Sequence, residues 1–507
     1  MGKKEIKQKL INNSIWGFVA SMINRVGALV FTIILARFLM PENYGIYSLV
    51  LSIAMIFATF NDIGISRTFI RYLSFSIKKN KKEASAYHFY LLRVKIILTL
   101  FLSVSLLISA YPLSFFVFKN SSLFAPLIVA GLYVLILTFE GFYSSVFYSV
   151  NRVDFISFKE SLLQILRITL VIFVVFFINK AYQISGIFFA MAIASFLLLI
   201  FNLYYIKKLM PSIFKKTDVE INKRKVNRFI GFLTIANISG IFFSYIDSIM
   251  LGIFLPNHIE FVGYYRVAFS LIIGIAGILS FLNSILLSFF SKMNIKRSSI
   301  ILNKAIKYLS IISIPSIFGL IILRDFFIRF FFGVEYSYSS FSLLLLSPLI
   351  FFIVAIGLFS SLFSAEEKPQ IFAKLILITT LINIVLNFIL IKSFLLISPH
   401  WAIAGAAIAT TISWIFYFFS SVYYMKREFK ISLLFGNVFK PILASAVMGI
   451  VLYILLSFIN NLNFLTAIFI ISGSAVVYLI TLFLIGGINK SDIELLYSFF
   501  YPSRRLI

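Results

Sequence analysis

Long apolar segments alternate with short polar ones along the whole chain. Each apolar segment holds roughly 20 residues or more, which lets a helix cross about 30 Å of hydrocarbon. The residue-by-residue alternation typical of barrel strands is absent from the sequence. Because a helix satisfies its own backbone hydrogen bonds in lipid, the pattern predicts an all-α integral membrane protein with fourteen transmembrane helices. The predicted spans are residues 14–39, 44–73, 86–110, 123–150, 156–178, 184–206, 229–255, 262–290, 301–323, 341–364, 371–394, 401–425, 438–459 and 463–486.

Segments in the second half of the chain repeat segments of the first half at a nearly constant offset. FYSSVFYSVNRVDF matches LFSSLFSAEEKPQI, where Ser144 answers to Ser360, and 360 minus 144 is 216. ILARFLMPENYGIYSLVLS matches IMLGIFLPNHIEFVGYYRVAFS, where Gly45 answers to Gly263 at an offset of 218. A third matched segment contains Tyr204 and Tyr423. Three matches in the same order along the chain indicate an internal duplication. Further matched pairs are Leu39 with Leu255 and Gly186 with Gly405.

The duplication predicts the organisation of the chain. Each copy holds six spans, so the two copies have the same orientation in the membrane and form two parallel lobes. The predicted regions are a first lobe at 1–206, a basic linker at 207–228, a second lobe at 229–425 and a C-terminal region at 426–507 with two further helices. Two parallel bundles that face each other enclose a cavity that opens to either side by rocking, which is the architecture of a transporter.

The charge distribution gives the orientation. A net charge of +27 would by itself suit a nucleic-acid-binding protein. The basic residues, however, gather before the first predicted span and after every even-numbered one up to the twelfth, while the opposite connections hold few. By the positive-inside rule, both termini are cytoplasmic in a multi-pass protein of the cytoplasmic membrane. The expected partners of this basic surface are membrane lipids, with no nucleic acid.

Enzyme chemistry has no candidate residues in this sequence. There is no cysteine, and His88, His258 and His400 lie far apart. No acidic metal cluster, glycine-rich phosphate loop or nucleophile constellation is present. We therefore expect no enzymatic activity, no metal and no bound cofactor. Without an ATPase motif, the driving force must come from an ion gradient, the membrane potential or the gradient of the substrate, and the choice between Na⁺ and H⁺ coupling stays open.

Charged residues inside the predicted spans are candidate functional residues, because they are costly to bury in lipid. Matching their depth along the helices gives three candidate pairs. They are Arg25 with Asp62, Glu140 with Arg167, and Asp247 with Arg266. In one interpretation each pair neutralises itself between neighbouring helices. In the other, Arg25 and Arg266 line the cavity and hold an anionic group, since a guanidinium binds phosphate through two parallel hydrogen bonds.

Three further arginines lie toward the ends of the first two spans. Arg67 and Arg71, four residues apart on one helical face, either guide an anionic group in from the cytoplasmic side or extend to lipid headgroups. For Arg37, near the outer end of the first span, anchoring at the membrane interface is favoured.

Several of these segments resemble a known family. ARFLMPENYGIYSLVLSI followed by FNDIGISRTFIRYLS resembles the first two helices of bacterial and archaeal polysaccharide transporters, the O-antigen-type flippases, in which an L-A-R-x-L-x-P-x-x-Y-G-x-Y string and a D-x-G string recur. The chain departs from this string at Met40, where Gly is common. The second half looks like helices seven, eight, ten and eleven of the same family, and the resemblance covers residues 10–430. These proteins belong to the multidrug/oligosaccharidyl-lipid/polysaccharide exporter superfamily, with a MATE-like arrangement of two six-helix lobes.

The resemblance implies a flippase. It would move a polyprenyl-diphosphate-linked oligosaccharide, such as the repeat unit of O-antigen or another surface polysaccharide, from the inner to the outer leaflet by alternating access. Arg25 and Arg266 lie on helices one and eight, where related lipid flippases place essential arginines, and Arg67, Arg71 and Arg167 complete the expected cationic set. Asp62 fits the D-x-G string, and either binds a coupling ion or orients a helix.

Two alternatives within the superfamily stay open. One is a flippase for lipid II, the peptidoglycan precursor. The other is a cation-coupled multidrug antiporter, although such proteins typically carry an acidic residue in the first helix, where this chain has Arg25. The resemblance also implies a monomer that works beside polysaccharide polymerase or glycosyltransferase machinery.

Overall fold

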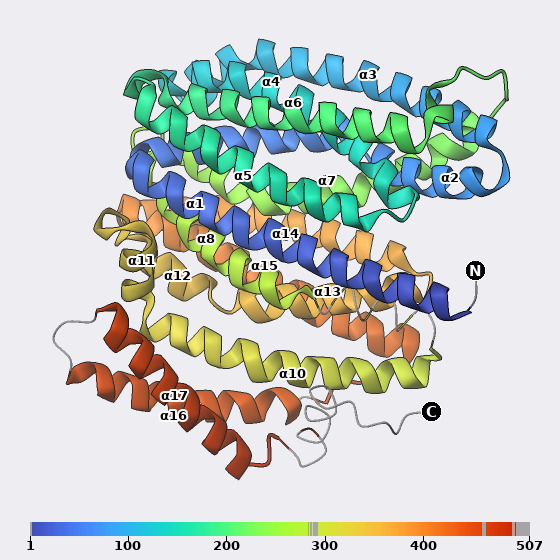
Figure 1. Ribbon diagram of the computed structural model, residues 1–507. Helices are drawn as coiled ribbons and strands as arrows, with labels where there is room; N and C mark the ends of the chain where they lie inside the picture. The colour runs from blue at the N-terminus through green and yellow to red at the C-terminus, as the bar shows by residue number, and fades with distance from the viewer. Residues whose placement is uncertain are drawn as a thin grey trace.

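The chain folds as a stack of long helices, and the residues described by the computed structural model contain no strand (Figure 1). The backbone is described for residues 3–281, 283, 286, 290, 293–434, 436–458, 463–488 and 492. Side chains are described from residue 19 onward in these ranges, except 20, 21, 78, 79, 232, 233, 235 and 236.

The first half of the chain forms one bundle and the second half another. The first-half helices are α1 (Lys3–Asp62), α2 (Ile65–Lys79), α3 (Lys81–Pro112), α4 (Phe124–Ser149), α5 (Val153–Phe177) and α6 (Gln183–Leu209). The second-half helices are α7 (Lys223–Phe254), α8 (Glu260–Leu279), α10 (Ile295–Ile322), α11 (Arg324–Phe332), α12 (Ser339–Leu346), α13 (Leu349–Ala365), α14 (Pro369–Leu395) and α15 (Pro399–Phe429). The remaining helices, α16 (Gly436–Ser457) and α17 (Phe464–Leu484), pack on α10 (Figure 1).

Helix α1 contains the first predicted span and most of the second, because a single residue turns the chain between them. Met40 has φ 61° and ψ 167°, a conformation that glycine adopts far more readily than other residues. Pro41, which has no N–H to donate, follows it. A second break, at Gly64 with φ 82°, separates α1 from α2. The turn expected between the predicted spans 14–39 and 44–73 is therefore present at Met40 and makes them a helical hairpin. Methionine adopts the backbone conformation there at a position where the related string commonly has glycine.

The two halves repeat backbone geometry as well as sequence. Asn151 and Glu367, 216 positions apart, both have positive φ angles, of 56° and 57°. The next N–H group in each half, of Arg152 or Lys368, donates to a carbonyl five residues earlier at 2.9 Å. The predicted internal repeat is confirmed at these positions, whereas the boundaries of the four predicted regions stay predictions.

The halves meet through two equivalent glycines. A Cβ added to Gly45 would lie 2.2 Å from the carbonyl oxygen of Ile259, and one added to Gly263 would lie 2.5 Å from that of Pro41. Both Gly263 and Ile259 are 218 positions after their first-half equivalents, so the contact is reciprocal, as at a two-fold interface. We call this the hairpin end of the molecule. The opposite linker end holds residues 210–222, where the Ser85 hydroxyl donates to the Ile213 carbonyl at 3.3 Å.

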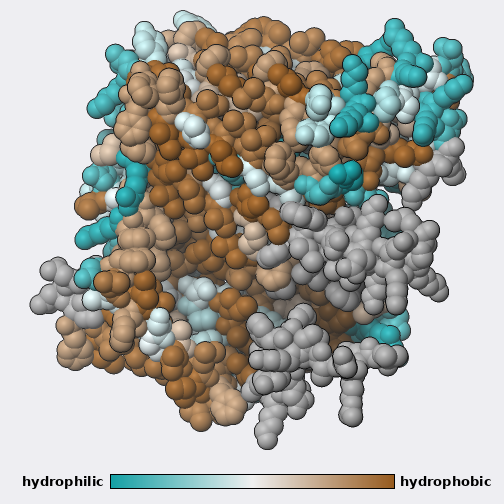
Figure 2. Space-filling view, in the orientation of Figure 1, coloured by the Kyte–Doolittle hydropathy of each residue, from teal (hydrophilic) through white to brown (hydrophobic). Residues whose placement is uncertain are grey.

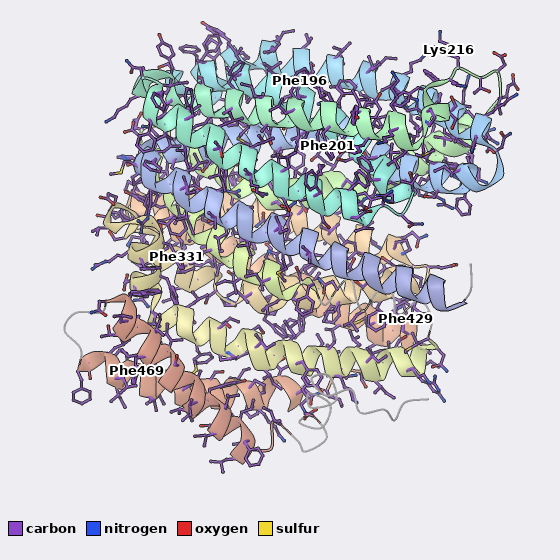
Figure 3. All side chains as sticks on the ribbon, in the orientation of Figure 1. Phe196, Phe201, Lys216, Phe331, Phe429 and Phe469 are labelled. Carbon is purple, nitrogen blue, oxygen red and sulfur yellow. The ribbon has the colours of Figure 1, made fainter. Side chains whose placement is uncertain are left out.

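The surface is that of a membrane protein. Apolar side chains cover the middle of the face shown in Figure 2, and hydrophilic ones gather toward its ends. Phe469 on α17 is 84% exposed and points away from the protein (Figure 3). Twelve helices of the described chain are long and apolar enough to cross a membrane, or thirteen if the bent pair α12 and α13 forms one span. One of these candidates, Met22–Ile77, covers the first two predicted spans, and the total of fourteen stays a prediction.

Gly45→Ala should destabilise the protein, because the Ile259 carbonyl is backbone and has no flexible side chain to yield. Overpacking of this kind costs about 1–3 kcal/mol, so the midpoint of thermal unfolding of the purified chain in detergent should fall. Gly141→Ala in α4 is the matched control, since nothing lies within 4 Å of its added Cβ. An unchanged midpoint for Gly45→Ala would show that the hairpins are not closely packed.

Candidate functional site

Arg25 lies where the two halves face each other. It projects from α1 onto α8, and a Cβ added to Gly277 would lie 3.0 Å from its Nη1 atom. Asp62, the expected partner of Arg25, is instead paired with Lys95 at 3.2 Å and accepts hydrogen bonds from the hydroxyl and N–H of Ser66. The predicted pair of Arg25 with Asp62 is therefore wrong. The contacts of Asp62 hold the break between α1 and α2, which is the helix-orienting alternative.

Arg266 lies on α8 and is held by α7 and by aromatic rings. Its Nη1 donates to the carbonyl of Ser244 at 3.3 Å, and its guanidinium carbon lies 5.0 Å from the Tyr245 ring centroid and 5.5 Å from that of Phe269. Arg266 and Gly277, which contacts Arg25, are eleven residues apart on one helix, or about 16 Å at 1.5 Å per residue. Arg266 also lies within electrostatic range of Tyr44 on α1. The two arginines therefore lie at two levels along the α1–α8 contact rather than in one site.

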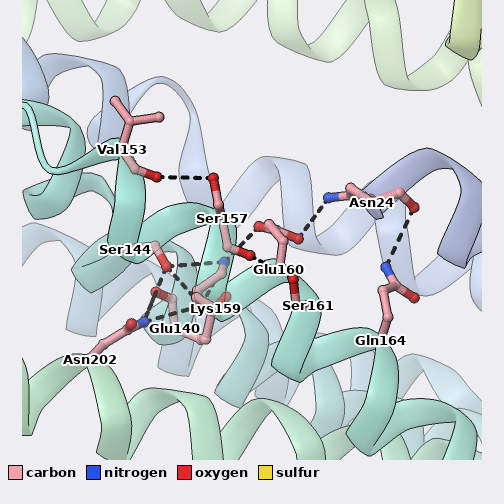
Figure 4. Close-up of polar contacts among 10 residues, drawn as sticks. All are labelled: Asn24, Glu140, Ser144, Val153, Ser157, Lys159, Glu160, Ser161, Gln164 and Asn202. Carbon is pink, nitrogen blue, oxygen red and sulfur yellow. Dashed lines mark hydrogen bonds and ion pairs between the residues drawn. The ribbon is translucent and has the colours of Figure 1, made fainter. Parts of the chain in front are cut away.

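Glu140 anchors a buried polar network in the first half (Figure 4). Its Oε1 atom accepts hydrogen bonds from Lys159 Nζ at 3.1 Å, Ser144 Oγ at 2.8 Å and Asn202 Nδ2 at 3.1 Å. These side chains come from α4, α5 and α6. The predicted pair of Glu140 with Arg167 is wrong, because Lys159 is the cation that pairs with Glu140.

The same network reaches α1. Lys159 also pairs with Glu160 at 2.9 Å, and Glu160 accepts a hydrogen bond from Asn24 Nδ2 at 2.7 Å. Gln164 donates to the Asn24 carbonyl at 3.5 Å (Figure 4). The network thus connects the interior of the first half to the residue that precedes Arg25.

Arg167 lies on an aromatic ring. Its guanidinium carbon is 3.9 Å from the centroid of Phe31 on α1, and its Nε is buried without a hydrogen bond to any described residue. Tyr47 and Tyr133 lie within electrostatic range of it. Arg67 and Arg71 are exposed on α2, and the Arg71 guanidinium carbon lies 4.4 Å from the Phe229 ring centroid of α7.

Asp247 is enclosed by neutral donors. Its carboxylate accepts hydrogen bonds from Tyr265 Oη at 2.5 Å, Thr410 Oγ1 at 2.8 Å and Asn387 Nδ2 at 2.7 Å. Asn383 Nδ2 donates to Thr410 at 3.4 Å, and the Oδ1 atoms of Asn383 and Asn387 are buried without a hydrogen-bond donor among the described residues. The predicted pair of Asp247 with Arg266 is wrong. A buried carboxylate among unpaired oxygens offers a site for a proton or a small monovalent cation.

The sequence analysis missed the partners of Asp247. Asn383 and Asn387 are four residues apart, so they lie on one face of α14, and this spacing inside an apolar segment was the available signal. Tyr265 and Thr410 carry no comparable signal. Because oxygen ligands from four different helices converge, only the packed structure shows this group.

Arg37 joins the halves at the hairpin end. Its Nε donates to the carbonyl of Phe331 on α11 at 2.8 Å and its Nη2 donates to that of Phe330, while Tyr336 Oη donates to the Ala36 carbonyl at 2.8 Å. Lysines and arginines are well suited to the carbonyls at a helix C-terminus. Arg37 is nevertheless exposed, so its anchoring at the membrane interface stays a prediction.

Comparison with known proteins agrees with this architecture. A family model described as "Polysaccharide biosynthesis protein" matches residues 10–294. The chain belongs to this family. A probable low-salt glycan biosynthesis flippase, Agl15 of Haloferax volcanii, is 28% identical over 200 residues, which are 38% of this chain and 40% of the relative's length.

Solved structures support the fold over nearly the whole chain. The lipid II flippase MurJ in an inward closed conformation aligns with a TM-score of 0.75 at 18% identity, covering 96% of this chain and 99% of MurJ. The MATE multidrug transporter DinF-BH aligns with a TM-score of 0.59 at 18% identity, covering 87% of this chain and 98% of its own. The predicted polysaccharide transporter family is confirmed by the family match, and the solved structures confirm the MATE-like fold. The relatives named here are flippases or transporters.

Lys159→Met should destabilise this family member more than the double change Lys159→Met with Glu140→Gln. Both variants leave Glu160 without Lys159. The single change also leaves the Glu140 carboxylate buried without its cation, which costs about 3–5 kcal/mol, whereas the double change removes that charge as well. Thermal unfolding of both variants in detergent measures the difference. Equal midpoints would show that the ion pair is not the interaction that holds α4, α5 and α6 together.

Proposed function

We propose that the protein is a flippase that moves a polyprenyl-diphosphate-linked oligosaccharide of a surface polysaccharide from the inner to the outer leaflet of the cytoplasmic membrane. The observation that carries this proposal is the placement of Arg25 and Arg266 at two levels of the contact between the halves. The family and the glycan flippase among the relatives supply the substrate class.

The chemistry of the two arginines suits a diphosphate. A guanidinium stays charged at any physiological pH and donates paired hydrogen bonds to phosphate oxygens. Because the two levels are about 16 Å apart, the diphosphate would contact Arg25 first and Arg266 later on its way to the hairpin end. Arg67 and Arg71 are exposed on α2, where Arg71 lies on Phe229 near the start of α7, and they would attract the same group at the entrance.

The orientation follows from the basic linker. By the positive-inside rule, the linker end and both termini lie in the cytoplasm and the hairpin end lies outside. In this orientation, the contact of Gly45 with Ile259 and the hydrogen bonds of Arg37 would close the proposed route on the outer side. Release requires those contacts to separate.

An apolar cavity suits the polyprenyl chain. It has a volume of about 340 Å³ and lies between α10, α13, α15 and α16, so the appended C-terminal hairpin supplies one wall. Its lining is entirely apolar and aromatic, with Phe318, Phe351 and Phe418 among its residues. The sugar and diphosphate would pass between the halves while the lipid stays in an apolar environment. We further expect a monomer that works beside polysaccharide polymerase or glycosyltransferase machinery.

A lipid II flippase is the second candidate, favoured by the likeness to MurJ along nearly the whole chain. Both substrates carry the same polyprenyl diphosphate, so the arginines do not distinguish one substrate from the other. The two candidates are distinguished by deleting the gene and identifying the lipid-linked glycan that accumulates in the inner leaflet. A multidrug antiporter for cationic drugs fits less well, because Arg25 and Arg266 would repel such substrates.

Arg25→Ala and Arg266→Ala should each lower surface glycan by at least about tenfold, because a hydrogen bond to a charged group contributes about 1.5–3 kcal/mol. The lipid-linked precursor should accumulate, and the variant should remain in the membrane. Arg427→Ala, at an exposed arginine near the end of α15, is the matched control. Normal export by both variants would refute the role of these arginines.

Asp247→Asn should uncouple transport from its driving ion. We propose that Na⁺ or H⁺ binds among Asp247, Asn383, Asn387 and Thr410, and asparagine keeps the size of the side chain while removing its charge. In proteoliposomes, transport by the variant should fall about tenfold or more and lose its dependence on the imposed Na⁺ or H⁺ gradient. Asp325→Asn, at an exposed carboxylate on α11, is the control. A variant that keeps the wild-type gradient dependence would exclude this coupling site.

A further inference from the structure

The internal repeat lets each residue around Asp247 be compared with the residue at the equivalent place in the first half. The offsets are those of the matched segments on the same helices, and α5 and α14 also begin 216 positions apart, at Val153 and Pro369. The equivalent pairs are Phe31 with Asp247, Arg167 with Asn383 and Val171 with Asn387 at 216, Tyr47 with Tyr265 at 218, and Met191 with Thr410 at 219. We call these the first-half cluster and the second-half cluster.

The contacts within the two clusters correspond as well. Tyr265 Oη lies 3.3 Å from Thr410 Oγ1, and Tyr47 Oη donates to Met191 Sδ at 3.9 Å. In the second half, Asp247 on α7 faces the amides of α14. In the first half, Phe31 on α1 faces the Arg167 guanidinium of α5 at 3.9 Å. Both the positions and the helix pairs that touch are therefore equivalent.

The chemistry of the two clusters is opposite in sign. The second-half cluster presents a carboxylate and two unpaired amide oxygens, which attract a cation. The first-half cluster has Phe31 in place of the carboxylate and a guanidinium in place of an amide. A guanidinium over an aromatic face is stabilised by the ring quadrupole, so this cluster already contains a cation.

We propose that Arg167 is a tethered cation, which permanently occupies the place in the first half where an exchangeable Na⁺ or H⁺ binds in the second half. This inference rests on the proposed coupling at Asp247 and goes beyond it. In the first half, the Arg167 guanidinium therefore keeps α1 packed against α5 throughout the transport cycle. Only the second half responds to the ion gradient, and each chain exchanges cations at one cluster rather than two.

Arg167 is in this view a positioning residue for α1. Beside it on α5, Gln164 packs against Gly27, where an added Cβ would meet its Cγ at 2.6 Å, and donates to Asn24. The tethered cation and Gln164 together hold the part of α1 that carries Arg25. Removal of the guanidinium should therefore impair transport without changing the affinity of the second-half cluster.

Chemical rescue tests the tether directly. Arg167→Ala in the full-length protein in proteoliposomes should lose at least tenfold in transport rate, and millimolar guanidinium chloride should restore a large part of it, whereas equal sodium chloride should not. Arg167→Lys, which keeps a tethered cation, should retain more activity than Arg167→Ala. Adding Phe31→Leu to Arg167→Ala removes the aromatic face and should abolish the rescue. A folded Arg167→Ala variant with full activity, or one that guanidinium does not rescue, overturns the proposal.

Cation counting tests the asymmetry. Sodium-22 binding and proton uptake should give one exchangeable cation per wild-type chain and none for Asp247→Asn. The combined change Phe31→Asp, Arg167→Asn, Val171→Asn and Met191→Thr gives the first half the side chains of the second-half cluster, and the count should rise to two. Two cations in the wild type, or one in the folded quadruple variant, contradict the tethered cation. A wild-type count that survives Asp247→Asn instead refutes the coupling site, while guanidinium rescue still decides the role of Arg167 if the quadruple variant does not fold.

Discussion

A charged side chain inside a membrane must be compensated within the protein, because lipid supplies neither water nor hydrogen-bond donors. This constraint determines how the helices of this protein are joined. Glu140 and Lys159 connect α4, α5 and α6, and Lys95 secures the break between α1 and α2 through Asp62. Asp247 draws neutral donors from three neighbouring helices. The helices themselves follow from apolar length, but their mutual arrangement depends on these few polar contacts.

The sequence predicted the class, the repeat, the hairpin and the family, because each depends on patterns that are local or periodic along the chain. It did not predict the charge pairs. Depth along a helix was the only available criterion, and depth does not specify which side of the helix a residue occupies. Arg167 matches Glu140 in depth, yet it faces Phe31 of α1, while Lys159, eight residues earlier on α5, faces Glu140. The rotation of each helix about its axis and the rotamers of its side chains depend on packing among several helices at once.

The two halves share one helix arrangement because the chain is internally duplicated, but their polar side chains differ. The backbone contacts at the hairpin end remained equivalent, since a side chain at Gly45 or Gly263 would collide with the opposite backbone. The clusters around Phe31 and Asp247 diverged in sign. Symmetric contacts suit an interface that must close reproducibly. Under the proposed coupling, the unlike clusters would let the second half bind an ion for which the first half has no site.

The energies of the contacts separate charges that stabilise the fold from charges available to a substrate. Breaking a buried ion pair such as Glu140 with Lys159 costs about 3–5 kcal/mol, so an incoming anion would gain little by displacing the carboxylate. A cation–π contact contributes about 0.5–2 kcal/mol. Arg266 is held by the rings of Tyr245 and Phe269 and by one carbonyl, which leaves most of its donors for a phosphate group. Under the proposed function, binding of the diphosphate to Arg266 would therefore cost less free energy than binding to Lys159.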